Sequence, residues 1–166
     1  MTVKDHVILS SAASLALWTE LGFDAIFFWV AAIGIDLDHY IDYIWHNGFT
    51  DFGIKKMFLY HHVLERFWGR SEFLNVVIFH TVEFVAPLFV ISYWTGSTAL
   101  FALSLGLTFH IACDIVFLLR LRIFLIRAHS FTEYFIRKRR FENRGLKPGS
   151  VFAEAIKIVN ETGGEI

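Results

Sequence analysis

Four separate segments of this chain each carry a histidine with a carboxylate within four residues. They are Asp5 with His6, the run Asp36, Asp38 and His39 followed by Asp42, His80 with Glu83, and His110 with Asp114. Imidazole and carboxylate groups together bind zinc, manganese or iron, and several carboxylates can bridge more than one ion. Two of the segments lie inside long apolar runs, where an unpaired ionisable side chain costs several kcal/mol. We therefore predict that the four segments share one metal centre.

The spacing within the segments suits shared ligation, because residues three or four positions apart lie on the same face of an α-helix. The pairs related in this way are His80 with Glu83, His110 with Asp114, Asp38 with Asp42, and Asp36 with His39. If the segments are helical, both members of each pair point to the same side. Carboxylate-bridged di-iron bundles use the same logic, although the order of their ligands differs.

The composition predicts an integral membrane protein. The 166 residues are 55% hydrophobic, with 19 phenylalanines and five tryptophans, and the mean hydropathy is +0.52. An ordinary soluble protein is less apolar than this. Two stretches, 73–94 and 99–119, each have about the twenty residues that an α-helix needs to cross the hydrocarbon core. Two shorter stretches, 7–21 and 23–35, precede them, so we expect an all-α bundle of about four transmembrane helices.

The basic residues indicate the orientation of this bundle. No Lys or Arg occurs between Asp5 and Ile54, whereas nine occur from Arg120 to Lys147. The predicted turns between the paired helices contain neither residue. By the positive-inside rule, both termini and the connection 36–72 face the cytoplasm. We therefore expect a multi-pass protein of the cell (inner) membrane in contact with lipids, and a net charge of −1 gives no reason to expect nucleic acid.

We divide the chain into a transmembrane bundle with the metal site (1–120) and a basic, amphipathic tail at the cytoplasmic interface (121–166). Apolar residues of the tail recur at helical spacing among basic ones, as in an interfacial helix attracted to anionic lipid. Further helices are expected at 36–45, as an extension of the second span, at 59–68 on the surface, and at 151–159. The single cysteine, Cys113, excludes a disulfide framework.

This topology places the polar segments at a common depth. With about 1.5 Å of rise per helical residue, His80 lies roughly 10 Å and Asp114 roughly 9 Å inside the cytoplasmic ends of their helices. His6 starts the first helix and Asp36 ends the second, on the same side of the membrane. The four segments are therefore expected to meet near the cytoplasmic face.

Three motifs resemble those of bacterial and archaeal membrane-bound metal-dependent hydrolases. The segment 34–39, Gly-Ile-Asp-Leu-Asp-His, is similar to the D-x-D-H signature of that family. The residues around His80 are similar to its T-H-S segment, and 106–114 resembles its G-x-x-x-H-x-x-x-D segment. With His6 at the front, the resemblance covers residues 5 to 115 in order. The family is distantly related to zinc-dependent phospholipase C and P1 nuclease, in which H-x-x-x-D and H-x-x-x-E pairs bind a zinc cluster.

The resemblance implies a set of metal ligands. Carried over by position, the ligands are His6, Asp36, Asp38, His39, His80, His110 and Asp114. The implied cofactors are divalent metal ions, zinc first, with manganese or iron as alternatives. Two positions depart from the family pattern: Ile35 stands where the family has proline, and Asn75 stands where it has the first histidine of H-R-G-x-T-H. Glu83 offers a nearby acid that can substitute for that histidine.

The leading hypothesis is a membrane-embedded metal-dependent hydrolase that acts on a phosphoester, including a lipid-linked one, at the cytoplasmic face. A carboxylate that is not used in ligation, Asp38 or Glu83, would serve as general base. Two alternatives stay open. In one, His80 and His110 ligate haem, or the carboxylates hold a di-iron redox centre. In the other, the polar clusters only join the helices of a non-catalytic membrane subunit or scaffold.

Overall fold

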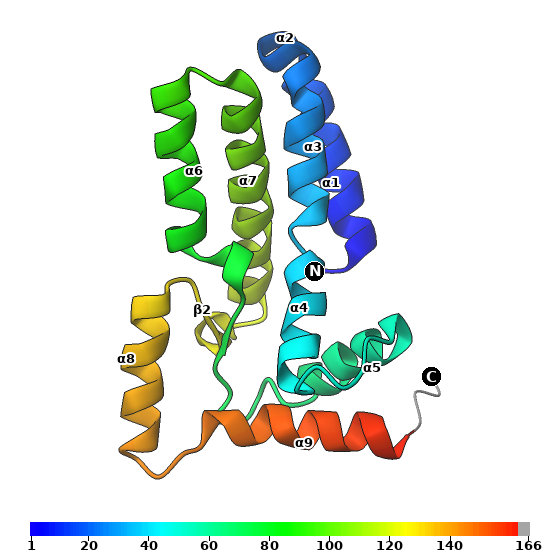
Figure 1. Ribbon diagram of the computed structural model, residues 1–166, viewed down its shortest axis with the longest axis vertical. Coiled ribbons are helices and arrows are strands. Elements are labelled where there is room, and N and C mark those ends of the chain that lie inside the picture. Colours follow the sequence, from blue (N-terminus) through cyan, green and yellow to red (C-terminus); the bar gives the residue numbers. More distant parts are fainter. Residues whose placement is uncertain (163–166) are drawn as a thin grey trace. The chain divides into compact units, whose positions relative to one another are not determined.

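The computed structural model describes residues 1–162 and is helical over most of that length (Figure 1). The α-helices are α1 (Val3–Ala16), α2 (Trp18–Leu21), α3 (Ala25–Gly34), α4 (Leu37–His46), α5 (Ile54–Glu65), α6 (Val82–Thr95), α7 (Thr98–Arg120), α8 (Phe131–Glu142) and α9 (Pro148–Glu161). Short 3-10 turns are η1 (Gly22–Asp24), η2 (Ile78–His80) and η3 (Phe124–Ile126). Two short strands, β1 (Asn75–Val76) and β2 (Arg127–Ala128), pair in parallel. The all-α prediction is therefore confirmed.

The chain folds into two compact units. Unit 1 contains residues 1–36 and 78–124, and unit 2 contains residues 37–77 and 125–166. The predicted boundary at residue 120 lies close to the end of unit 1, but unit 2 also includes the segment 37–77, which we had placed in the bundle. Each unit has its own buried core and is described separately below.

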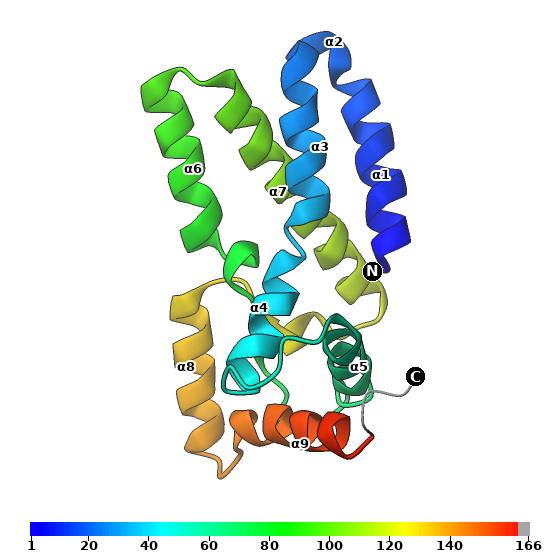
Figure 2. The same cartoon turned by 45° about the vertical axis from the view of Figure 1, so that its right-hand side comes forward.

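Unit 1 is a bundle in which α3 packs along α7, with α1 beside α3 and α6 beside α7 (Figures 1 and 2). The contact between α3 and α7 is close because Gly106 has no side chain. A Cβ atom at that position would lie 2.2 Å from the carbonyl oxygen of Phe28. The nearby residues Ala32 and Ala102 are fully buried and have side chains of a single methyl group. Small residues therefore set the distance between the two helices that carry most of the site.

The buried face of α1 is polar. His6, Ser10 and Ser14 follow one another at intervals of four residues and are all buried. The hydroxyl of Ser14 donates a hydrogen bond to the carbonyl oxygen of Ala25 (2.9 Å). On the opposite side, Ile8 and Leu15 are 66% and 74% exposed. The helix thus turns its polar residues inward and its apolar residues outward, the reverse of a helix at the surface of a water-soluble domain.

Three of the expected helices differ in the structure. The stretch 73–94 is not one helix, because β1 and η2 occupy its first part and α6 begins only at Val82. Pairing of β1 with β2 satisfies backbone groups that a helix would otherwise bond internally. The segment 36–45 does not extend the second helix, since α3 ends at Gly34 and α4 is separate. Helix α5 is not a surface helix, because Tyr60 and Val63 belong to the core of unit 2.

Within residues 1–162, α7 is the one helix long and apolar enough to cross a membrane, and α6 is apolar but shorter. The core helix of a soluble protein can meet the same criteria of length and composition. The turns predicted between the paired helices are present. Gly96 ends α6 in the left-handed conformation (φ 64°), and Gly22 ends α2 with a φ of 54°. Glycine adopts these angles at no steric cost.

In unit 2, α9 packs on α5 and also contacts α4 and α8. Its core joins Tyr43, Tyr60, Phe73 and Phe152 with aliphatic residues of α5 and α9. The guanidinium of Arg70 lies over the ring of Phe67 and donates two hydrogen bonds to the carboxylate of Glu154 (2.6 and 2.9 Å). The C-terminal segment that we predicted as an interfacial tail therefore contributes to a packed core.

A histidine in α4 is expected to make the stability of unit 2 depend on pH. Nδ1 of His46 lies 3.1 Å from Oδ1 of Asp42. Burial alone would lower the pKa of His46, but the hydrogen bond and negative charge of Asp42 outweigh burial and raise it. Because the folded state binds this proton more tightly, the stabilisation is complete below the unfolded pKa of about 6.5 and is lost as pH rises through the folded pKa. The temperature at the midpoint of thermal unfolding should therefore decrease as the pH is raised through this range. In the variant His46→Gln this decrease should be smaller, because the titrating group is absent. An equal dependence of the midpoint on pH in the variant would contradict the assignment to His46.

Candidate metal centre

Five of the predicted ligand residues lie together in unit 1. They are His6 of α1, Asp36 after α3, His80 of η2, and His110 and Asp114 of α7, and we call them the His/Asp cluster. Four of them are almost completely buried, with exposed fractions of 3% for His6, 1% for His80, 0% for His110 and 5% for Asp114. Asp36 is only partly buried. The polar side chains of elements that are far apart in the sequence therefore lie together inside unit 1.

The carboxylate of Asp114 occupies the middle of the cluster. Its Oδ1 atom lies 3.2 Å from Nε2 of His6, and its Oδ2 atom lies 3.6 Å from Nε2 of His80. Oδ1 also lies 3.4 Å from the amino nitrogen of Met1. On the other side, Oδ1 of Asp36 lies 3.3 Å from Nε2 of His110 and 3.9 Å from Nε2 of His80. Nε2 of His110 also lies 3.9 Å from Oδ2 of Asp114, so Asp114 contacts three imidazoles and Asp36 contacts two.

These separations match those of ligands around a small ion. In a tetrahedral site with bonds of about 2.1 Å, ligand atoms lie roughly 3.4 Å apart. Two groups of three residues have their ligand atoms within 4.8 Å of one another, close enough to surround one ion after small shifts of the side chains. One group is His6, His110 and Asp114, and the other is Asp36, His80 and His110. Because His110 belongs to both groups and its Nε2 atom has a single lone pair, the cluster provides ligands for one ion, which either group could hold.

His110 is oriented as a metal-ligating histidine. Its Nδ1 atom lies 2.7 Å from the carbonyl oxygen of Ala32 on α3. Since a carbonyl oxygen only accepts, Nδ1 carries a proton, and in the neutral imidazole Nε2 presents its lone pair to the cluster. Nε2 is buried and makes no hydrogen bond of good geometry. A second-shell carbonyl that fixes the tautomer in this way is typical of metal-bound imidazole.

The charges of the cluster also favour a cation. Two carboxylates held close to each other in a buried site repel unless positive charge is supplied. Protons on the imidazoles are one source of that charge. However, the rings of His6 and His110 are stacked with centroids 3.7 Å apart and an interplanar angle of 8°. Two stacked imidazolium rings would repel, so neutral imidazoles together with a metal ion fit this arrangement better.

Asp5 has a structural role at the start of α1, whereas the sequence grouped it with His6 at the metal centre. Its Oδ2 atom accepts hydrogen bonds from the hydroxyl (2.7 Å) and the backbone N–H (3.1 Å) of Thr2. The hydroxyl of Thr2 in turn accepts from the N–H of Asp5, which completes a capping box at the start of α1. Asp5 therefore fixes the first turn of α1 and with it the position of His6.

The remaining predicted residues are not members of the two groups of ligand atoms. Asp38 and His39 belong to the first turn of α4 in unit 2, where Asp38 is 1% exposed and the carbonyl oxygen of His39 accepts from the ring of His61 (2.8 Å). Glu83 is exposed in the first turn of α6. Its predicted pairing with His80 on one helical face is wrong, because His80 lies in η2 and the extended backbone of Thr81 intervenes.

Comparison of the chain with protein-family models, with curated proteins and with solved structures gave no match.

Proposed function

We propose that unit 1 is the catalytic bundle of a membrane-embedded, metal-dependent hydrolase that cleaves a phosphoester at the cytoplasmic face. The observation that carries this proposal is the buried cluster of three imidazoles and two carboxylates with ligand-like spacing. The donors fit zinc, and manganese or iron are alternatives. The similarity of the motifs to those of membrane-bound metal-dependent hydrolases supports the same reading.

The outer surface of unit 1 supports the membrane location. Large apolar side chains are exposed along its helices, among them Phe23 (80%), Trp94 (79%) and Val30 (55%). Apolar exposure on this scale indicates contact with lipid or another protein. We propose that α1, α3, α6 and α7 form a four-span bundle, with local thinning of the bilayer around the shorter helices. Lys4 and Arg120 flank the end with the His/Asp cluster, and by the positive-inside rule these charges support a cytoplasmic position for that end.

Hydrolysis requires attack of a water oxygen on phosphorus and cleavage of the bond between phosphorus and the ester oxygen. One proton of the water passes to a base, and the leaving alkoxide takes up a proton to become an alcohol. Divalent cations supply positive charge to the phosphoryl oxygens and acidify the water. The side chain of Asp36 is 25% exposed, whereas that of Asp114 is 7% exposed. Water therefore reaches Asp36 more readily, and we assign the base to the carboxylate oxygen of Asp36 that does not ligate the metal, with Asp38 and Glu83 as the alternatives.

The proposal is tested with purified protein that is stripped by a chelator and reloaded with zinc or manganese. We expect metal-dependent release of 4-nitrophenolate from 4-nitrophenyl phosphate or its diester. Asp36→Asn should lower kcat by about 100-fold or more, as the loss of a general base does, because the amide cannot accept the proton. Glu83→Gln, at an exposed position, serves as the matched acid-to-amide comparison. Native protein with stoichiometric metal that hydrolyses neither ester would overturn the proposal.

A metal-free scaffold is the second candidate, because the distances of 3.2–3.9 Å between imidazole nitrogens and carboxylate oxygens also suit ion pairs. Elemental analysis after gentle purification separates the two candidates.

A haem centre is disfavoured by the geometry. The rings of His80 and His110 meet edge to face with centroids 5.2 Å apart, which leaves no space between them for a macrocycle.

A further inference from the structure

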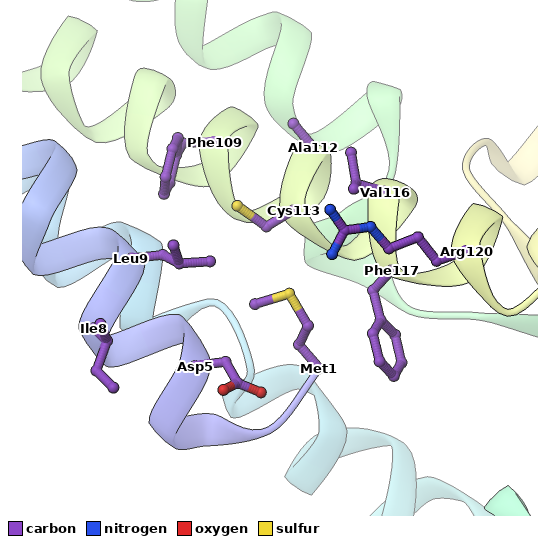
Figure 3. Close-up of a pocket in the computed structure, with 10 residues that line it drawn as sticks. All are labelled: Met1, Asp5, Ile8, Leu9, Phe109, Ala112, Cys113, Val116, Phe117 and Arg120. Atoms are coloured by element: carbon purple, nitrogen blue, oxygen red, sulfur yellow. The ribbon is translucent and has the colours of Figure 1, made fainter.

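A cavity of about 630 Å³ lies between α1 and α7 in unit 1 (Figure 3). Its walls are mostly apolar and include Ile8 and Leu9 of α1 and Phe109, Val116 and Phe117 of α7. On α7 the lining residues recur every three or four positions from Phe109 to Arg120, so they form one stripe along the helix. A volume of this size falls within the range of about 300–1,000 Å³ found for small-molecule sites.

The cavity adjoins the His/Asp cluster. The lining residue Phe109 precedes His110 in the sequence, and the lining residue Cys113 precedes Asp114. Met1 touches both places, because its thioether projects into the cavity (Figure 3) while its amino nitrogen lies 3.4 Å from Oδ1 of Asp114. A ligand in the cavity would therefore have one end beside the cluster.

The charges at the cavity favour an anionic group. Its two charged side chains are those of Asp5 and Arg120. The carboxylate of Asp5 is already hydrogen-bonded to Thr2 in the capping box. Arg120 forms no ion pair within residues 1–162, and Figure 3 shows its guanidinium turned back over α7 toward Cys113. A guanidinium of this kind suits a phosphate oxygen.

We propose that this cavity holds the hydrocarbon chain of the substrate, so that the substrate is an anionic lipid phosphoester whose phosphate lies at the His/Asp cluster. The inference rests on the proposed function and adds the substrate class to it. The apolar stripe of α7 binds the chain by burying its methylene groups, each of which contributes about 0.8 kcal/mol. Arg120 contacts the headgroup, and the adjacent ligands His110 and Asp114 place the ester bond beside the metal.

Binding is tested first, without reference to activity. Cys113 is the one cysteine of the chain and lines the cavity, so a maleimide reports directly on its occupancy. We expect hexadecyl phosphate to slow alkylation of Cys113 at least tenfold in detergent-purified protein. Butyl phosphate and inorganic phosphate, which share the headgroup chemistry but lack a long chain, should leave the rate unchanged. Equal rates with all three compounds would overturn the proposal.

Substrate choice is tested with Ala112→Trp, which adds a large side chain to the cavity wall on α7 at a residue that is not part of the His/Asp cluster. The rate ratio of hexadecyl phosphate to 4-nitrophenyl phosphate should fall at least tenfold, with metal content unchanged. Ala86→Trp makes the same change at an exposed position of α6, outside the cavity lining, and should keep the native ratio. A native ratio in Ala112→Trp would refute the chain site.

The two tests separate failure of this inference from failure of the proposed function. If native protein loaded with metal hydrolyses neither ester, the hydrolase proposal fails, and protection of Cys113 by hexadecyl phosphate still decides whether the cavity binds a chain. If both esters are hydrolysed but hexadecyl phosphate does not protect Cys113 from alkylation, the proposed hydrolase activity is supported and the proposed site for the hydrocarbon chain is refuted.

Discussion

Replacing His110 with alanine is expected to abolish stoichiometric zinc binding, with a loss of affinity of at least about 100-fold. His110 belongs to both groups of ligand atoms in the His/Asp cluster, so its removal leaves neither group complete. Loss of even a second-shell partner typically weakens metal binding by about 10–100-fold, and loss of a shared ligand should cost more. Metal content by mass spectrometry and titration calorimetry with zinc measure the effect.

Controls are needed because alanine at a fully buried position also leaves a cavity. Asp114→Asn keeps the shape of its side chain while it removes the charge, and it should lose metal as well. His62→Ala removes an imidazole from an exposed position of α5, where the side chain is 58% exposed, and should retain metal. If His110→Ala and Asp114→Asn both kept stoichiometric metal, the cluster would not be the binding site.

The sequence predicted the grouping of the polar side chains best where the chain is regularly helical. His110 and Asp114 lie four residues apart in α7, and both belong to the His/Asp cluster. His6 was included among the predicted ligands because of the resemblance of the motifs, with Asp5 and His6 at the front of the matched segment. Spacing alone does not distinguish the role of the neighbouring Asp5 from that of His6. The capping box with Thr2, visible as Thr-x-x-Asp, was the signal that Asp5 has a structural role.

The prediction failed where long-range pairing decides the local structure. Hydropathy placed residues 73–94 in one span, yet β1 pairs with β2, which is some fifty positions away in the sequence. Hydropathy is a local average and carries no information about such a partner. As a result His80 reaches the cluster from a 3-10 turn, and the helical pairing with Glu83 does not form. The sequence predicted Arg120 only as a charge at the end of a membrane span, because the cavity that Arg120 lines is formed by residues of both α1 and α7.

The closest contact of the bundle gives the second large expected effect. Substituting Gly106 with valine should destabilise unit 1 by roughly 1–3 kcal/mol or more, as overpacking of a tight core does. The Cβ atom would lie 2.2 Å from the oxygen and 2.9 Å from the carbon of the Phe28 carbonyl group, which are backbone atoms that cannot rotate away. Helices α3 and α7 must then separate. Thermal unfolding in detergent, followed by circular dichroism, measures the loss.

Separation of these helices should also weaken metal binding, because the carbonyl oxygen of Ala32 on α3 holds the ring of His110 on α7. Gly106 lies one turn before His110, so a shift at the glycine moves the ring relative to its hydrogen-bond partner. Gly34→Ala is the matched control: nothing lies within 4 Å of a Cβ atom there, and the change should alter stability by less than about 1 kcal/mol. Native stability and metal affinity in Gly106→Val would show that the two helices do not approach as closely as described, and the orientation of His110 would then need another cause.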